Sequence, residues 1–230
     1  MQSNTIRTCV KEIFTSIQGE GPYVGYKQLF IRFCKCNLTC NFCDTDFLAD
    51  EKTKNYTPEE LLSTIKQLNL TNIHSISLTG GEPLLETAFL NKFLLLVNQK
   101  IYLETNGTLP EKLLEIIDLV DIISMDIKLQ SATSGPDFFE KHKRFIKIAE
   151  ANDKEIFAKA VFDETISDEE IDKIVNIVKD YNIELILQPL MVGNTMKMAP
   201  QKLVEIFDKF VEKYPKTRII PQSHKFINVE

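Results

Sequence analysis

The sequence predicts an α/β protein folded as a partial (β/α)6 barrel. Short apolar segments alternate with amphipathic helical segments along most of the chain, which is typical of βα units around a parallel sheet. About six such units follow one another, fewer than the eight of a closed barrel. No linker-rich stretch or shift in composition interrupts them, so we expect residues 1–230 to form a single domain with an N-terminal segment and a short C-terminal extension.

The first predicted elements are two strands around a glycine-rich turn. Residues 8–17 alternate apolar and polar side chains, residues 18–22 read QGEGP, and residues 29–34 form an apolar run that predicts the first core strand. Thr57-Pro58-Glu59-Glu60 then combines an N-cap residue, a proline suited to the first helical turn and a capping-box glutamate. This pattern predicts a helix that ends near Leu68.

The same alternation of strand and helix continues to the C-terminus. Apolar, β-rich runs predict the core strands, and capping boxes, prolines and helical periodicity predict the helices between them. The predicted strands are 73–78, 101–103, 122–125, 156–162, 183–187 and 217–220. The predicted helices are 86–98, one that begins at Pro110, 136–151, one that begins at Ser167, and 200–214, before a tail at 221–225.

Composition and charge narrow the class of protein. The net charge of −6 and the pI near 5.3 give no reason to expect a surface for nucleic acid or anionic membranes. No apolar run approaches the ~20 residues that a transmembrane helix needs, and the first residues lack the apolar core of a signal peptide. Five cysteines, three of them clustered, favour a reducing compartment over a disulfide framework. We therefore expect a cytoplasmic protein.

Three cysteines lie at C-x3-C-x2-C spacing in the loop that follows the first core strand. The polar residues Asn37, Thr39, Asn41 and Asp44 lie between and beside Cys36, Cys40 and Cys43, which argues against a role for all three as core side chains. A structural zinc site normally has four ligands, and the remaining Cys9 and Cys34 form no second C-x2-C pair. Three thiolates on a four-iron cube leave one iron open to a small molecule. The motif therefore favours catalysis, with a non-enzymatic zinc-binding module as the alternative.

Polar residues recur where the predicted strands end. Because ligands bind at the carboxyl ends of the strands in barrel-like parallel sheets, we expect these residues and the cysteine loop to form one polar rim. Arg32 stands inside an apolar strand, where an unpaired charge is costly, and this position favours a functional role. The residues of the rim are Thr79 to Pro83, Glu104 to Asn106, Asp126 with Lys128, and Gln188.

The cysteine spacing, followed by the Thr79–Pro83 stretch TGGEP, resembles the radical S-adenosylmethionine (SAM) superfamily. The resemblance implies a [4Fe–4S] cluster on Cys36, Cys40 and Cys43, with SAM chelating the open iron and yielding a 5′-deoxyadenosyl radical on reduction. It also implies that Phe42 lies near the adenine of SAM. The implied SAM-binding residues are Phe42, Asp44, Gly80, Gly81, Glu82, Asn106, Ser124, Asp126, Lys128 and Gln188.

Further segments resemble one family within that superfamily, the 7-carboxy-7-deazaguanine synthases. The most specific are SIQGEGP at 16–22 and CNLTCNFCDT at 36–45, joined by residues 30–32 and 222–225. The resemblance implies the conversion of 6-carboxy-5,6,7,8-tetrahydropterin to 7-carboxy-7-deazaguanine with release of ammonia. This carbon–nitrogen lyase reaction belongs to the biosynthesis of queuosine and related 7-deazapurines, and Mg²⁺ assists it.

The same resemblance implies roles for residues outside the cluster motif. Arg32 would pair with the substrate carboxylate, a task suited to the planar guanidinium fork. Thr45 would provide the one protein oxygen to Mg²⁺, which takes its other ligands from water and substrate. The implied substrate-binding residues are Ile17, Gln18, Gly19, Glu20, Arg32, Thr79, Gln222 and His224.

The resemblance also implies partners. They are an electron donor such as a flavodoxin or ferredoxin, and a second copy of the chain in a homodimer. A glycyl-radical-enzyme activating protein is the alternative radical enzyme, and it would use the same cluster on a glycine of another protein. The SIQGEGP segment and Arg32 favour the small pterin substrate over that alternative.

Overall fold

The computed structural model describes residues 5–41, 43, 45–133 and 136–229. Its strands are β1 (Thr8–Ile17), β2 (Lys27–Phe33), β3 (Lys54–Tyr56), β4 (Ser75–Gly80), β5 (Ile101–Thr105), β6 (Ile122–Ile127), β7 (Glu155–Phe162), β8 (Glu184–Pro189), β9 (Met191–Val192), β10 (Thr195–Met196) and β11 (Thr217–Ile219). The longer helices are α1 (Pro58–Ile65), α2 (Thr87–Leu94), α3 (Pro110–Leu114), α5 (Phe139–Ala151), α6 (Asp168–Val178) and α7 (Pro200–Lys213). Short helical segments are η1 (Gly21–Tyr23), η2 (Pro83–Glu86), η3 (Ile117–Leu119), α4 (Gln130–Thr133) and α8 (Ser223–Ile227).

Within these described residues, nine strands form one sheet in the order β11-β8-β7-β6-β5-β4-β2-β1-β3. The run from β2 to β11 is parallel throughout. In contrast, β1 pairs antiparallel with β2, and β3 pairs antiparallel with β1. Since β3 and β11 lie at opposite edges, the sheet does not close on itself. The predicted partial barrel is confirmed, and β11 extends it by a further parallel strand.

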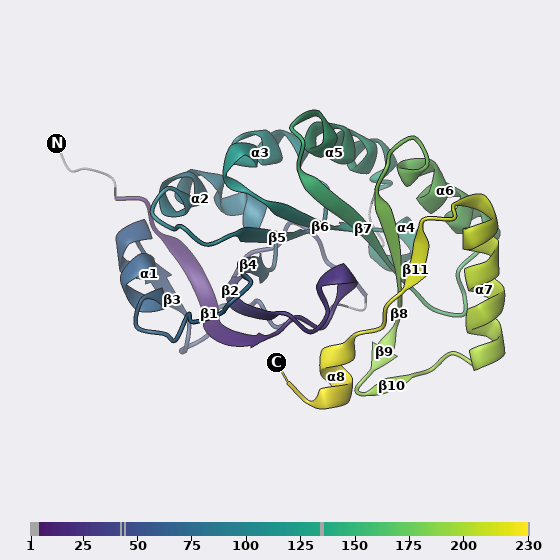
Figure 1. Cartoon of the computed structure of the whole chain (residues 1–230), viewed down its shortest axis with the longest axis horizontal. Coiled ribbons are helices and arrows are strands. Elements are labelled where there is room, and N and C mark those ends of the chain that lie inside the picture. Colours follow the sequence, from purple (N-terminus) through teal and green to yellow (C-terminus); the bar gives the residue numbers. More distant parts are fainter. Residues whose placement is uncertain (1–4, 42, 44, 134–135, 230) are drawn as a thin grey trace.

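Helices α1, α2, α3, α5, α6 and α7 follow one another along the outer face of the curved sheet (Figure 1). Their apolar faces are buried there, as with Phe89 and Phe93 of α2 and Phe145 of α5, each at most 1% exposed. The expected capping boxes are present. At the start of α1 the Thr57 hydroxyl accepts from the Glu60 N–H at 3.2 Å, and an equivalent box opens α6. Local signals therefore define where these helices begin.

The inner face of the sheet changes from apolar to polar along the strands. A separate buried cluster at one end contains Tyr102, Ile122, Phe157 and Ile186. Side chains two residues apart on a strand point to the same face. A polar side chain lies two residues beyond each member of the cluster, toward the carboxyl end of its strand. These side chains are Glu104, Ser124, Lys159 and Gln188.

Several short elements are not predicted by the sequence. They are β3, the β9–β10 hairpin, α4, and α8, which occupies the predicted C-terminal tail. Each spans five residues or fewer, too short for an apolar period to stand out. Helix α2 begins at Thr87, because 83–86 form the separate turn η2, and it ends at Leu94, before the predicted limit near 98. No helix in the described part of the chain has the length and apolarity needed to cross a membrane.

Candidate active site

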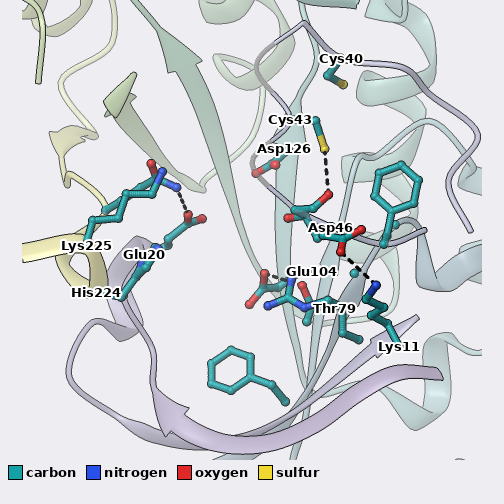
Figure 2. Close-up of a pocket in the computed structure, with 18 of the residues that line it drawn as sticks. Lys11, Glu20, Cys40, Cys43, Asp46, Thr79, Glu104, Asp126, His224 and Lys225 are labelled. Atoms are coloured by element: carbon teal, nitrogen blue, oxygen red, sulfur yellow. Dashed lines mark hydrogen bonds and ion pairs between the residues drawn. The ribbon is translucent and has the colours of Figure 1, made fainter. Parts of the chain in front are cut away.

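A cavity of about 990 Å³ opens at the carboxyl ends of the parallel strands. Its walls come from the strand ends, from β1 and the turn after it, from the cysteine loop and from α8. Figure 2 shows Cys40 and Cys43 on one side of this space and Glu20 and His224 on another. The polar rim predicted from the sequence therefore surrounds one cavity.

The two glycines at the end of β4 allow the cysteine loop to pack closely. A Cβ on Gly81 would lie 1.9 Å from the carbonyl oxygen of Lys35, so a side chain there would displace the loop backbone. Gly80 has a φ of +115°, a conformation that L side chains rarely adopt. The Glu82 N–H donates to the same Lys35 carbonyl at 2.6 Å. These contacts fix the residue that directly precedes Cys36.

Asparagine side chains tie the cysteine loop to the turn after β5. The Asn106 amide donates to Asn37 Oδ1 at 2.8 Å, and the Asn37 amide donates to the Thr108 hydroxyl at 2.9 Å. Both the N–H and the hydroxyl of Thr108 donate to Asn106 Oδ1, at 3.0 and 2.6 Å. Asn106 lines the cavity, as expected of a SAM-binding residue, but its side chain also holds the cysteine loop in place.

The three motif cysteines all line the cavity. Burial raises the pKa of Cys36 and of Cys40, and the nearby Cys43 thiol contributes to both shifts in the same direction. Among the described residues, no three Cys, His, Asp or Glu side chains already converge as a metal site. Three thiols that face one space, with no imidazole among them, fit an iron–sulfur cube that binds as their protons leave.

Glu82 lies behind the cysteine loop, outside the cavity lining. Its side chain is 0% exposed. Its oxygens accept from the Leu84 N–H at 3.0 Å, the Thr105 hydroxyl at 2.9 Å and the Asn106 N–H at 2.8 Å. Burial raises the pKa of Glu82 to about 7 despite these donors. The carboxyl group that the resemblance associates with SAM thus supports the turn after β5 in this structure.

The raised pKa of Glu82 predicts a pH-dependent contribution to stability. Because the folded-state pKa lies above the ordinary value of 4.5, the native state binds more protons than the unfolded chain between pH 4.5 and 7. The contribution is fully present below pH 4.5 and is lost as the pH rises through 7. The unfolding free energy of Glu82→Gln, taken relative to that of the wild type, should therefore rise by about 3 kcal/mol as the pH increases across this range. Denaturant titrations at both ends of the range measure the gain, and a pH-independent difference between the two proteins would contradict it.

Four charged side chains form a largely buried ion-pair network across the inner face of the sheet, with Lys159 at its centre. Lys159, 4% exposed, pairs with Glu20 and, at 3.1 Å, with Asp126. Lys128 pairs with Asp126 at 3.0 Å. Burial alone would raise the pKa of Asp126, but the two lysines lower it to about 2. Burial would likewise raise the pKa of Glu20, and Lys159 holds that pKa below its ordinary value. Both carboxylates are therefore ionised at neutral pH.

Glu20 also connects the two ends of the chain. Its Oε1 accepts from the Gln188 amide at 3.2 Å and from the Gln222 amide at 2.8 Å. The backbone N–H of the residue before His224 donates to the Gly19 carbonyl at 2.8 Å. Gly19 packs so closely that a Cβ there would lie 2.2 Å from the His224 Nδ1. The residues implied for substrate at the N-terminal turn and in the C-terminal segment are thus neighbours.

A further set of hydrogen-bonding groups lies beside Glu20. The Gln18 amide donates to Glu104 Oε1 at 2.9 Å, and the Thr79 hydroxyl donates to Glu104 Oε2 at 3.0 Å. Gln18 Oε1 in turn accepts the Glu20 N–H at 3.0 Å. In the part of the chain that the structure describes, Gln188 Oε1 is buried without a donor. An N–H group of a bound molecule would satisfy it.

Arg32 reaches the cavity from β2 and has a partner on the neighbouring strand. It stands opposite Glu12 of β1, and its Nε donates to Glu12 Oε1 at 2.5 Å. The guanidinium also lies over the Phe14 ring, 5.6 Å from the centroid. Of the described carboxylates, Glu12 is the one that pairs with Arg32, and it engages only Nε. Both Nη atoms are therefore available to an anion in the cavity.

Lys11 holds the loop that follows the cysteines. Its Nζ donates to Asp46 Oδ2 at 2.9 Å, to the Leu48 carbonyl at 2.9 Å and to Asp50 Oδ2 at 2.8 Å, and Figure 2 shows the Lys11–Asp46 pair. Thr45, the implied Mg²⁺ ligand, lies directly before this clamped segment and lines the cavity. The clamp thus restrains the segment that directly follows Thr45.

Most of the implied site residues lie around this one cavity, and their binding roles stay predictions. Ser124 and Glu82 do not line it, since Ser124 is 1% exposed and Glu82 is 0% exposed. Phe42 and Asp44 lie outside the described residues. Those that line it are Ile17, Gln18, Gly19, Glu20, Arg32, Cys36, Cys40, Cys43, Thr45, Thr79, Gly80, Gly81, Asn106, Asp126, Lys128, Gln188, Gln222 and His224.

The charged residues of the site that are not predicted by the sequence include Lys159, Glu12 and Lys11. Lys159 interrupts the apolar run 156–162 in the way that Arg32 interrupts β2. The argument from buried charge that selects Arg32 would therefore have selected Lys159 as well. Glu12 and Lys11 lie on an alternating strand, where charged residues are ordinary, and no sequence signal distinguishes them.

A family model described as the radical SAM superfamily matches residues 30–201. A 7-carboxy-7-deazaguanine synthase from Geobacter sulfurreducens is 36% identical, with 95% of this chain and 96% of that protein covered. A protein of the same name from Archaeoglobus fulgidus is 32% identical, with 97% of this chain and 100% of that protein covered.

Solved structures share the fold. The crystal structure of QueE from Escherichia coli matches with a TM-score of 0.66 at 18% identity and covers 95% of both chains. Streptococcus suis SuiB bound to S-adenosylmethionine matches with a TM-score of 0.60 at 16% identity, over 84% of this chain and 49% of that one. At these identities the likeness concerns the fold alone, and it agrees with an open, mostly parallel sheet.

Proposed function

Because the chain belongs to the 7-carboxy-7-deazaguanine synthase family of the radical SAM superfamily, we propose that it converts 6-carboxy-5,6,7,8-tetrahydropterin to 7-carboxy-7-deazaguanine with release of ammonia. This reaction is a step in the biosynthesis of queuosine and related 7-deazapurines. Membership of the superfamily brings a [4Fe–4S] cluster and SAM as cofactors. The observation that carries the proposal is one cavity lined by three thiols, by Arg32 and by the Glu20 carboxylate.

The cysteine loop and the strand ends would hold the cofactors. Cys36, Cys40 and Cys43 would bind the cluster, and Gly80 and Gly81 lie beside them at the cavity wall. When bound, the cluster and SAM would supply the radical chemistry that acts at C6 of the pterin. The role of the protein chain itself is to bind the pterin, orient C6 and limit the access of water.

The polar groups of the cavity match the two ends of a carboxylated pterin. One end carries a carboxylate, which suits the Nη atoms of Arg32 that Glu12 leaves available. The other end carries N–H donors on the pyrimidine ring, which suit acceptors. Glu20 is such an acceptor because Lys159 keeps its pKa low, and Gln188 Oε1 is another because it is buried without a donor among the described residues.

We assign Mg²⁺ to the cavity wall beside Thr45. Mg²⁺ accepts few protein ligands and keeps water and substrate oxygens for the rest. The Thr45 hydroxyl can provide one oxygen, and the clamp of Lys11 on Asp46 keeps the following loop in position. The substrate carboxylate would complete the set, which joins the metal and Arg32 in one recognition site.

The proposed reaction also needs partners. Reduction of the cluster requires an electron donor, for which a flavodoxin or ferredoxin has the appropriate chemistry. Sulfur ligands that must stay reduced favour the cytoplasm as the compartment. We further propose that the protein works as a homodimer, as the family resemblance implies, and sedimentation of the anaerobic protein tests this.

Arg32→Met is expected to raise the KM for the pterin roughly 10- to 100-fold, because a hydrogen bond to a charged group contributes about 1.5–3 kcal/mol. Steady-state kinetics under anaerobic conditions measure the change. Arg218→Met is the matched control, since Arg218 pairs with Glu184 at 3.2 Å on the surface and is half exposed. An unchanged KM in Arg32→Met, or an equal rise in both variants, would refute the role of Arg32.

The activity test uses the reconstituted protein alone. It is incubated without oxygen with SAM, a reductant, Mg²⁺ and 6-carboxy-5,6,7,8-tetrahydropterin, and the deazaguanine acid is followed by liquid chromatography and mass spectrometry. We expect the product to accumulate with no second protein present. SAM cleavage that proceeds only when a glycyl-radical enzyme is added, with no pterin product, would instead favour an activating enzyme.

A further inference from the structure

The chain carries a second pair of cysteines beside the cluster loop, and the proposed reaction does not use it. Cys9 lies on β1 and is partly exposed, whereas Cys34 follows β2 and is 7% exposed. Neither residue belongs to the C-x3-C-x2-C motif or lines the active-site cavity. Cys34 stands two positions before Cys36, the first implied ligand of the cluster.

The strand register places these two cysteines opposite each other. The antiparallel ladder ends with Val10 opposite Phe33, and one residue beyond it on each strand the Cys34 N–H donates to the Cys9 carbonyl at 3.3 Å. Opposite residues of this hydrogen-bonded kind have Cα atoms about 5.5 Å apart. A disulfide needs a Cα–Cα distance of roughly 4.4–6.8 Å. The register and this hydrogen bond therefore bring the two backbones close to the spacing that a disulfide requires.

The side chains share one environment as well. Directly opposite residues of an antiparallel pair project from the same face of the sheet. The difference in exposure then sets an order of reaction, because an oxidant from solution can reach Cys9 but not Cys34.

We propose that Cys9 and Cys34 are a redox-active dithiol that a low-molecular-weight disulfide, such as oxidised glutathione, converts to a disulfide between β1 and the end of β2. The Cys9 thiolate attacks one sulfur of oxidised glutathione, breaks its S–S bond and releases one glutathione. The Cys34 sulfur then attacks the Cys9 sulfur of this mixed disulfide, and the second glutathione leaves. Two cysteine thiols lose two electrons and two protons, and oxidised glutathione gains them as two thiols.

The link should form without disturbing the cluster loop. Because the register already matches disulfide spacing, no backbone shift at Lys35 is needed, and its carbonyl keeps the 2.6 Å hydrogen bond from the Glu82 N–H. The linked protein is therefore expected to retain its iron. The disulfide would thus join the strand that carries Glu12 covalently to the strand that carries Arg32.

The test treats the anaerobic holoenzyme with oxidised glutathione and maps its peptides without reduction. Binding of the cluster occupies the motif thiols, so exchange is confined to the remaining cysteines. We expect a Cys9–Cys34 linked peptide, no retained glutathione, and an unchanged iron content per chain. A wild-type protein that forms no such link, or that loses iron in step with the link, would overturn the proposal.

Two single variants separate the steps. Cys34→Ser should stop at a glutathione adduct on Cys9, because the attacking second thiol is gone. Cys9→Ser should show neither adduct nor link, because Cys34 is buried. An adduct on Cys34 in the Cys9→Ser protein, or no adduct on Cys9 in the Cys34→Ser protein, would refute the assigned order. The readout is a covalent modification and does not depend on turnover of the pterin. The dithiol proposal and the proposed function can therefore be refuted independently.

Discussion

Replacing Cys40 by alanine is expected to remove the iron–sulfur cluster and, with it, essentially all conversion of the pterin. Cys36, Cys40 and Cys43 are the cysteines that line the cavity in the described structure, so no other thiol there can take over. A cube held by two thiolates would have two open irons and weak attachment. Iron and sulfide content after anaerobic reconstitution, followed by the product assay, measure the loss.

Cys9→Ala is the matched control for this substitution. Cys9 lies on β1, outside the motif and the cavity, and an alanine there removes a thiol that is not an implied cluster ligand. We expect this variant to keep its iron and to turn over the pterin like the wild type. A Cys40→Ala protein that retained full iron and full turnover would refute the three-thiolate assignment.

Lys159→Met is expected to lower the unfolding free energy by roughly 3–5 kcal/mol, because it leaves buried carboxylates without their cation. Asp126 would keep Lys128, but Glu20 would keep only the amides of Gln188 and Gln222. The pKa of Glu20 should then rise, since burial is no longer opposed by a neighbouring cation. Denaturant titrations measure the stability, and the pH dependence of KM for the pterin reports the ionisation of Glu20.

The matched control for this change is Lys173→Met. Lys173 pairs with Asp137 at 3.4 Å, but both side chains are about half exposed. Exposed ion pairs contribute about 1 kcal/mol or less, so this variant should stay close to the wild type. Equal losses of stability in the two variants would mean that the network around Lys159 contributes no more to the free energy of unfolding than an exposed ion pair does.

The elements that the sequence predicts correctly are those defined by local signals. The capping box at Thr57 and Glu60 is such a signal, and α1 begins where it indicates. The apolar runs that become the parallel strands are another, because a strand buried on both faces is apolar along its length. Arg32 is found for the same reason, since a charge stands out against apolar neighbours.

The remaining features depend on contacts between distant parts of the chain. Glu20 and Lys159 are 139 residues apart, and nothing local to either residue indicates their pairing. The position of Glu82 depends on the Lys35 carbonyl and on Asn106, which the fold brings together from separate loops. The TGGEP motif therefore predicts that Glu82 belongs to the site. It does not predict that the carboxyl group lies behind the cysteine loop.

The central claim is that three thiolates of this chain hold a four-iron cluster and leave one iron open to SAM. The most direct measurement is ⁵⁷Fe Mössbauer spectroscopy of the anaerobically prepared wild-type protein before and after addition of SAM. We predict that one iron of the four changes on addition of SAM while the three thiolate-bound irons do not. A protein that contains zinc in place of iron, or a cluster whose irons are all unaffected by SAM, would contradict the claim.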